Sequence, residues 1–327
     1  MNIHFSIIIP VFNRPDEVNE LLKSLTLQSD RDFEVVVVED GSTISCEDIC
    51  KLYDTQLNIK YLFKPNSGRS ETRNYGMERA SGNYFIIYDS DCIIPPHYFE
   101  TVRKFLSENY VDCYGGPDNA DDTFSDMQKA INYSMTSFFT TGGIRGGTKN
   151  AEKFTPRSFN MGIAKEVFEK VGGYKNMIGE DIDLSIRIKK AGFKTTLLKE
   201  AYVYHKRRLS VKKFFRQVNT FGKGRILLYH MHKDSLKLVH LLPLFFVLGN
   251  AFLVLLSLIF LNPCFLLPIA LYIVLLFIDS WIKNKKIFIA LASILTAYTQ
   301  LFGYGLGMGE EILTGKASKK TQEELYK

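Results

Sequence analysis

Apolar and polar residues follow two different patterns along the chain, which change at about residue 240. In the first part, short continuous runs rich in β-branched residues occur at 5–9, 34–39 (EVVVVE) and 84–88. Such runs are typical of strands buried on both faces of a parallel sheet. The segments between them have helical spacing, as in Leu21, Leu22 and Leu25. Strands alternating with helices predict an open, doubly wound α/β sheet.

Turn and capping residues place the starts of the helices. Asn13 is positioned to cap the first helix, whose first turn holds Pro15, Asp16 and Glu17. A third strand at 60–63 leads through an Asn-Ser-Gly turn into a helix that ends near residue 80. Ligands of doubly wound sheets lie beyond the carboxyl ends of the strands. Residues 10–13, 39–42 and 89–91 are therefore the first candidates for a site.

The second part of the chain has the pattern of a membrane protein. Residues 241–261 carry no charged side chain, and this run is long enough to cross a hydrocarbon core of about 30 Å. Two further apolar runs cover 263–278 and 287–308. We expect two to three membrane segments within 241–308 and a polar tail at 309–327. The first ten residues lack the basic and long apolar regions of a signal peptide.

Positive charge gathers before the first of these runs. The formal net charge is +6, and residues 206–237 hold ten Lys or Arg side chains against one acid, Asp234. Cations beside a membrane segment indicate its cytoplasmic side and favour anionic membrane lipids. We therefore expect a plasma-membrane, multi-pass protein with a cytoplasmic N-terminal domain, and no nucleic-acid partner.

The third apolar run conflicts with this charge rule. Lys283, Lys285 and Lys286 would be cytoplasmic if the first two runs form a hairpin, which would leave Lys316, Lys319 and Lys320 outside. Either the third run is re-entrant or interfacial, helped by its glycines at 303, 305, 307 and 309, or the charge rule is overridden here.

Composition adds two exclusions. Hydrophobic residues make up 46% and charged residues 23% of the 327 residues, so a disordered protein is excluded. The five cysteines form no Cys-x-x-Cys pair and no zinc-finger spacing, which fits a reducing compartment without disulfides or structural zinc.

Acidic residues at strand ends are the first candidates for chemistry. Asp89 and Asp91 follow the run YFIIY and emerge on one side of a strand end. Carboxylates suit Mg²⁺ or Mn²⁺, which can neutralise a diphosphate; the alternative is a solvated turn. Asp40 is placed to accept hydrogen bonds from a base or ribose, or else to form an Asx-turn with Gly41 and Ser42.

Further charged residues gather in two later helices. Arg69 and Arg73, four residues apart, could clamp phosphate, although Arg73 could equally pair with Glu71 or Glu78. Glu180 and Asp181 follow the glycine-containing loop VGGYKNMIG, an apparent hinge, and a carboxylate there could act as a general base. Acids in a first helical turn also serve as plain caps.

One histidine stands apart from the other candidates. His205 in the segment AYVYH could ligate a metal or donate to a leaving phosphate, or be an ordinary core or surface residue.

The order of these motifs carries a resemblance. The segments SIIIPVFNR, VVVVEDGS, NSGRSETRNYG, YDSD, RSFNMGIAKEVFEKVGGY, GEDIDLSIRIKKAGF and HKRR follow one another as in a family 2 glycosyltransferase of the GT-A fold. The resemblance covers about residues 5–225. It implies a GT-A domain at 1–225, with a nucleotide-sugar half (1–115) and an acceptor half (116–225), and then a basic amphipathic linker (226–240).

The resemblance also implies roles for single residues. The base and donor would be bound by Pro10, Phe12, Asp40, Arg73, Asp89 and Arg208. Asp91 and His205 would hold Mn²⁺ or Mg²⁺. Asp181 would be the catalytic base, with Glu180 binding acceptor or donor hydroxyls. Arg157 and Asn160 are candidates for acceptor contacts.

The implied reaction is a single inverting displacement onto a hydroxyl, with a UDP-sugar as the favoured donor and a lipid-linked or glycan acceptor, in the synthesis of surface glycan or glycolipid. No Q-x-x-R-W segment follows the Glu-Asp pair, which disfavours a processive synthase. A polyprenyl-phosphate sugar synthase and a non-catalytic, membrane-bound nucleotide-sugar-binding protein remain alternatives. The motifs leave the linkage and the oligomeric state open.

Overall fold

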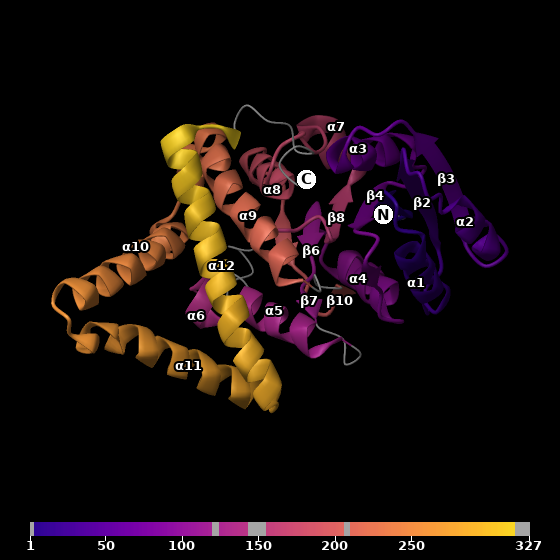
Figure 1. The fold of residues 1–327 in the computed structure, drawn as a ribbon. Coiled ribbons are helices and arrows are strands. Elements are labelled where there is room, and N and C mark those ends of the chain that lie inside the picture. Colours follow the sequence, from indigo (N-terminus) through magenta and orange to yellow (C-terminus); the bar gives the residue numbers. More distant parts are fainter. Residues whose placement is uncertain (1–2, 120–123, 143–154, 206–209, 318–327) are drawn as a thin grey trace. The chain divides into compact units, whose positions relative to one another are not determined.

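A computed structural model describes residues 3–119, 124–142, 155–205 and 210–317, and it divides into two compact units (Figure 1). The first unit is Met1–Asp121 with Thr148–Lys206, and the second is Asp122–Gly147 with Arg207–Lys327. Arg208, a predicted donor contact, lies outside the described residues. The boundary expected at residue 225 falls inside helix α9 (Val211–Met231). This helix belongs to the second unit, where it packs along α12 (Ile287–Thr314).

The first unit is built on a mixed, mostly parallel sheet of seven strands in the order β3-β2-β1-β4-β8-β6-β9. Only β8 runs antiparallel to its neighbours. The strands are β1 (Phe5–Val11), β2 (Phe33–Asp40), β3 (Asn58–Lys64), β4 (Tyr84–Tyr88), β6 (Cys113–Gly115), β8 (Asn160–Ala164) and β9 (Thr195–Leu197). A second sheet joins β5 (Cys92–Ile93), β10 (Val203–His205) and β7 (Asp118–Asn119).

Helices cover both faces of the large sheet (Figure 1). On one face, Phe99 of α4 packs on Phe5 and Phe33; on the other, Gly76 of α3 meets Ile8 and Val38. The helices of this unit are α1 (Pro15–Thr26), α2 (Glu47–Tyr53), α3 (Arg69–Arg79), α4 (Tyr98–Glu108), α7 (Lys165–Val171) and α8 (Glu180–Lys190). The predicted doubly wound α/β class is confirmed.

The predicted strands are confirmed, and one predicted cap is wrong. The runs at 5–9, 34–39, 60–63 and 84–88 all lie within β1 to β4. Asn13 does not cap α1, whose N-cap residue is Arg14 without a side-chain cap. Instead, the Asn13 side-chain oxygen accepts hydrogen bonds from the backbone N–H groups of Thr43 and Ile44, at 2.8 and 3.0 Å. The amide therefore links the loops that follow β1 and β2.

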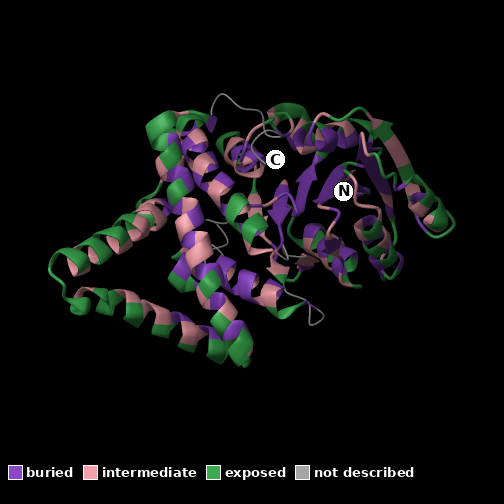
Figure 2. Cartoon of the chain, in the orientation of Figure 1, coloured by how far each residue is buried: buried purple, intermediate pink, exposed green. Residues whose placement is uncertain are grey.

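The second unit contains helices α5 (Asp126–Thr136), α6 (Phe138–Thr141), α9, α10 (Leu238–Ile259), α11 (Leu267–Asn284) and α12 (Ile287–Thr314). Among the residues that the structure describes, three helical segments are long and apolar enough to cross a membrane: Leu238–Ile259, Pro263–Asn284 and Ile287–Thr314. Very few residues of α10 and α11 are buried, whereas one side of α12 is buried (Figure 2).

The glycines of the third apolar run are packing positions in one unbroken helix, α12. A Cβ at Gly303 or Gly307 would press on α9, 2.5 Å from Val218 and 2.1 Å from the Asn219 carbonyl oxygen. One at Gly305 would lie 2.4 Å from the Pro243 carbonyl oxygen of α10. Because they lack side chains, these glycines let two helices approach α12 closely.

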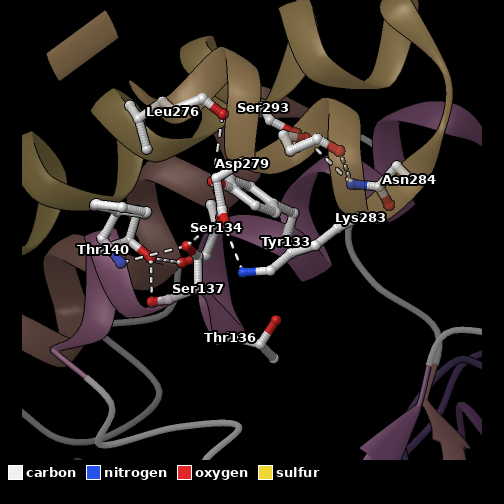
Figure 3. A network of polar contacts seen from close by, with 12 residues as sticks. Tyr133, Ser134, Thr136, Ser137, Thr140, Leu276, Asp279, Lys283, Asn284 and Ser293 are labelled. Atoms are coloured by element: carbon white, nitrogen blue, oxygen red, sulfur yellow. Dashed lines mark hydrogen bonds and ion pairs between the residues drawn. The ribbon is translucent and has the colours of Figure 1, made fainter. Parts of the chain in front are cut away.

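A polar network ties α5 and α6 to α11 (Figure 3). Asp279 accepts hydrogen bonds from the Tyr133 hydroxyl at 2.6 Å and the Ser137 hydroxyl at 3.3 Å, and pairs with Lys283 at 2.9 Å. The one carboxylate placed inside the second apolar segment thus has partners on three sides.

Candidate functional site

Arg73 is the centre of a buried ion-pair network at the carboxyl ends of the strands. It projects from α3, and its residue is 1% exposed. One guanidinium nitrogen donates to Asp89 at 2.7 Å, and the other donates to Glu180 at 3.1 Å. Burial disfavours the charged form, but Asp89 and Glu180 outweigh it and raise the pKa of the guanidinium. The buried arginine thus stays charged and joins the motif after β4 to the start of α8.

The two acids of the Glu-Asp pair have different surroundings. Glu180 is buried, and besides Arg73 it pairs with Arg69, whose Nε lies 2.9 Å from the carboxylate. Asp181 lies 3.5 Å from Arg157 and accepts a hydrogen bond from its neighbour's backbone N–H at 2.8 Å. Its side chain is 16% exposed, against 5% for Glu180. Asp181 is therefore the more accessible of the two carboxylates.

Asp91 and His205, the candidate metal pair, are brought together by the small sheet. His205 in β10 is paired in register with Cys92 in β5, directly after Asp91. The His205 Nε2 atom lies 3.0 Å from an Asp91 oxygen, and the imidazole stacks on Phe159 with ring centroids 4.9 Å apart. The two residues predicted to hold a metal are thus adjacent.

The donor atoms at this position fit a divalent cation. One ligand atom each of Asp91, His205 and Cys92 lie within 4.8 Å of one another. Carboxylate oxygen and imidazole nitrogen both suit Mn²⁺. The Cys92 thiol is buried, which raises its pKa well above the usual value, and it contacts the Phe159 carbonyl oxygen at 3.5 Å. Asp91 and His205 are therefore the residues that fit the ion.

Arg14 is a site residue that the sequence pattern did not single out. Its guanidinium lies 3.4 Å from an Asp91 oxygen and 2.6 Å from Glu17. Arg14 follows directly after the strand-end residues 10–13. Extending that segment by one residue would have included it.

The strand-end acids Asp40 and Glu39 hold the neighbouring loops. Asp40 is buried; its carboxylate accepts hydrogen bonds from the backbone N–H groups of Ser67 and Gly68, both at 2.9 Å, and pairs with Lys64. Burial disfavours the charged form of Glu39, but hydrogen bonds from Tyr61 and nearby serines outweigh it and lower its pKa.

The remaining predicted residues lie around these acids. Pro10 is partly buried at the end of β1, and Phe12 is 49% exposed beyond it. Asn160 is fully buried in β8, where its amide accepts from the Tyr98 hydroxyl at 2.5 Å and donates to the Ala201 carbonyl at 2.8 Å. Phe12 is thus placed to contact a ligand, while the contacts of Asn160 are with the framework.

The loop before the Glu-Asp pair is held in place rather than free. Arg187 donates to the backbone carbonyls of Val171 and Gly173, at 2.8 and 2.7 Å, and pairs with Asp183. Asn74 of α3 forms two hydrogen bonds with the backbone of Tyr174, both 2.8 Å long. The sequence suggested a hinge from the glycines alone, without these contacts.

Comparisons with known proteins agree on one family. The family described as glycosyl transferase family 2 matches residues 6–172, about half of the chain. An uncharacterised glycosyltransferase of Rickettsia conorii is 36% identical over 104 residues, which cover 32% of this chain and only 17% of that relative. Glycosyltransferase AglE of Haloferax volcanii is 27% identical over 253 residues, covering 75% of this chain and 80% of the relative.

A solved structure shows the same fold. The mannosyltransferase PcManGT from Pyrobaculum calidifontis, described in complex with GDP-Man and Mn²⁺, matches with a TM-score of 0.61 at 15% identity, over 97% of this chain and 88% of that one. The catalytic domain thus has the GT-A fold, as the order of motifs indicated. The chain belongs to glycosyl transferase family 2.

Proposed function

We propose that the chain is a membrane-anchored, metal-dependent, inverting glycosyltransferase that moves a sugar from a nucleotide-sugar to a hydroxyl of a lipid-linked acceptor. Two neighbouring groups of contacts support the proposal: Arg73 joins Asp89 to Glu180, and Asp91, two residues beyond Asp89, contacts His205. Donor, metal and base candidates therefore lie in one region of the first unit.

Asp181 is the general base of the proposed reaction. Its carboxylate takes the proton of the acceptor hydroxyl while that oxygen forms a bond to the anomeric carbon. The bond between the anomeric carbon and the diphosphate oxygen breaks, and the diphosphate leaves with the electron pair. Glu180 acts through the arginines, because its carboxylate is buried against Arg69 and Arg73.

Arg73 has a positioning role in the proposed reaction, because its guanidinium is buried and paired with two carboxylates. Arg73 fixes the carboxylate of Asp89, which is placed to bind ribose or the donor sugar. A divalent cation held by Asp91 and His205 would supply neutralisation of the leaving diphosphate. The Mn²⁺ and GDP-Man of the mannosyltransferase support a metal and a nucleotide-sugar donor in the same fold.

The proposal is tested by release of nucleoside diphosphate from the detergent-solubilised full chain. UDP-, GDP- and dTDP-sugars are supplied with Mn²⁺ or Mg²⁺ and a membrane lipid extract as acceptor source. We expect release from one donor, its loss with a chelator, and a lipid-soluble labelled product. Release with every donor and no acceptor dependence would contradict the assignment.

Two variants separate the roles of the acids. Asp181→Asn is expected to lower transfer at least 100-fold, since a positioned base contributes about 10²–10⁴-fold, yet to keep the affinity for the donor. Asp91→Asn is expected to lose Mn²⁺ binding, which is measured by electron paramagnetic resonance of Mn²⁺. Glu71→Gln, an exposed acid on α3, is the control for the loss of charge. Equal loss of donor affinity in both variants would refute the separate roles.

A further inference from the structure

Helix α12 is long and apolar enough to cross a membrane, but its packing differs from that of α10 and α11. In the most apolar 18 residues of α12, 39% of the residues are buried. The corresponding share is 0% for α10 and 11% for the segment that contains α11. The structure therefore provides protein partners along α12 that it does not provide for the other two.

The partners on one side of α12 are polar helices of the same unit. At its start, Lys286 pairs with Asp126 at 3.3 Å, and Thr296 donates to the Ala130 carbonyl of α5 at 3.0 Å. Towards its end, Gly307 meets Asn219 of α9, and Glu310 pairs with Lys223 at 2.8 Å. Helices α5 and α9 together follow α12 over most of its length (Figure 1).

Placing α5 and α9 in the hydrocarbon core of a membrane would be energetically costly. Helix α9 alone carries five basic residues, Lys212, Lys213, Arg216, Lys223 and Arg225. Each Lys or Arg costs about 2.5–3.5 kcal/mol at the centre of a bilayer. An α12 that crossed the membrane would take α9 and α5 with it, at a cost that the apolar face of α12 could not offset.

The opposite side of α12 is apolar, and it is exposed except where Phe302 packs on Phe246 of α10. Phe288, Leu295, Leu306 and Leu313 are 45–87% exposed. They are 7, 11 and 7 residues apart, close to whole numbers of 3.6-residue turns, so they share one face. A helix with one polar, protein-covered side and one continuous apolar side is typical of a helix lying in a membrane interface.

The hairpin of α10 and α11 packs on α12 through residues 243–247 of α10 and 272–280 of α11. In α10, Pro243 and Phe246 reach α12, where Phe246 packs on Phe302 with centroids 5.9 Å apart. In α11, Ser280 donates to Ser293 at 2.8 Å. Residues 249–267 of the hairpin extend away from α12, and they are largely exposed (Figure 2).

We propose that α12 lies in the plane of the membrane surface with its exposed apolar face in the lipid bilayer, and that only α10 and α11 cross. The charge pattern supports this arrangement. The lysines before α12 (283, 285 and 286) and Lys316 after it then lie on one side, together with the basic residues of α9. The conflict with the charge rule disappears.

Thiol labelling of the full chain in sealed vesicles tests the number of crossings. Cys264 lies exposed between α10 and α11, and the other four cysteines are buried. Lys285→Cys and Lys316→Cys, made in a Cys264→Ser background, are treated with a membrane-impermeant maleimide in vesicles of both orientations. We expect both to react from one side and native Cys264 from the other. Reaction of Lys316→Cys from the side of Cys264 would overturn the proposal.

Spin labels give an independent measure of depth. Cysteines substituted one at a time for Phe288, Leu295, Leu306 and Leu313 carry the label, and its collision rates with oxygen and a nickel chelate report depth in reconstituted bilayers. An in-plane helix places all four at a similar depth of about 5–10 Å. A crossing helix places the two central labels far deeper than the two terminal ones, which would refute the proposal.

Discussion

Replacing Arg73 by Met removes the charge that holds two carboxylates together in the first unit. Asp89 and Glu180 would lose contacts of 2.7 and 3.1 Å, while a side chain of similar length would still fill the buried space. The consequences differ for the two acids. The Asp89 side chain is 34% exposed, so its carboxylate can be hydrated by solvent. The Glu180 side chain is 5% exposed, and Arg69 would be its remaining ion-pair partner among the described residues.

These differences set the size of the effect. Removing one partner of a buried ion pair costs about 3–5 kcal/mol. The loss of the Asp89 contact costs less than this because solvent screens its charge, and the loss of the Glu180 contact costs less because Arg69 remains beside it. We therefore expect a loss of about 3 kcal/mol in the free energy of unfolding of the first unit. For a unit of this size each kcal/mol lowers Tm by about 2–4 °C, which gives a decrease of about 6–12 °C.

The cysteines offer an assay specific to this unit. Cys46, Cys50, Cys92 and Cys113 are all buried and all belong to the first unit, whereas Cys264 is exposed in the second. In a Cys264→Ser background, a thiol-reactive fluorophore therefore reports thermal exposure of the first unit's core in detergent.

Arg69→Met is the matched control, since Arg69 pairs with the same Glu180 but its side chain is 37% exposed. Exposed ion pairs contribute about 0–1 kcal/mol, so its Tm should fall by no more than about 4 °C. Equal decreases for both variants, or a decrease of less than 2 °C for Arg73→Met, would refute the reasoning.

Three further predictions follow from single contacts. Tyr61→Phe removes a hydrogen-bond donor that lowers the pKa of Glu39 in the folded protein. The stability that this hydrogen bond adds is present above the unfolded-state pKa of Glu39, about 4.3, and is lost as pH falls through its lower folded-state pKa. The Tm difference from wild type, measured by circular dichroism, should shrink below pH 4; a constant difference would argue against a charged Glu39. Gly307→Ala would place a Cβ 2.1 Å from a carbonyl oxygen of α9, whereas Gly249→Ala meets open space among the described residues. Fluorescence of the single tryptophan, in α11, should show a lower Tm only for the former. Arg14→Gln removes a cation competing for the candidate metal pair, and should raise Mn²⁺ affinity about two- to five-fold by paramagnetic resonance. Unchanged or weaker binding would exclude that competition.

The sheet and the strand-end acids were predictable because their signals are local. A continuous apolar run such as YFIIY has few places to lie except the middle of a covered sheet, and the residues after it must then emerge at the sheet edge. That argument found Asp89 and Asp91 directly. Asn13 shows its limit, because an amide able to cap the next helix is equally able to bridge to a loop thirty residues away.

Contacts between distant segments needed the structure. His205 reaches Asp91 only because β10 pairs with β5 in one register, and a shift of one residue would turn the imidazole to the other face. Asp183 and Arg187 lie four residues apart, the spacing of an ordinary ion pair along a helix. The same arginine also holds the loop at Val171 and Gly173, which no spacing rule along a single helix could show.

The start of α8 explains how two neighbouring acids can serve different purposes. Gly179 has a φ of 79°, a left-handed conformation that glycine adopts without strain, and the helix begins directly after it. Successive residues of a helix point about 100° apart, so Glu180 and Asp181 cannot face the same partner. Glu180 turns inward to the buried Arg73 and Asp181 turns to Arg157. Glu180 therefore holds the arginines, while the adjacent carboxylate stays the more exposed of the two, as the proton transfer proposed for it requires.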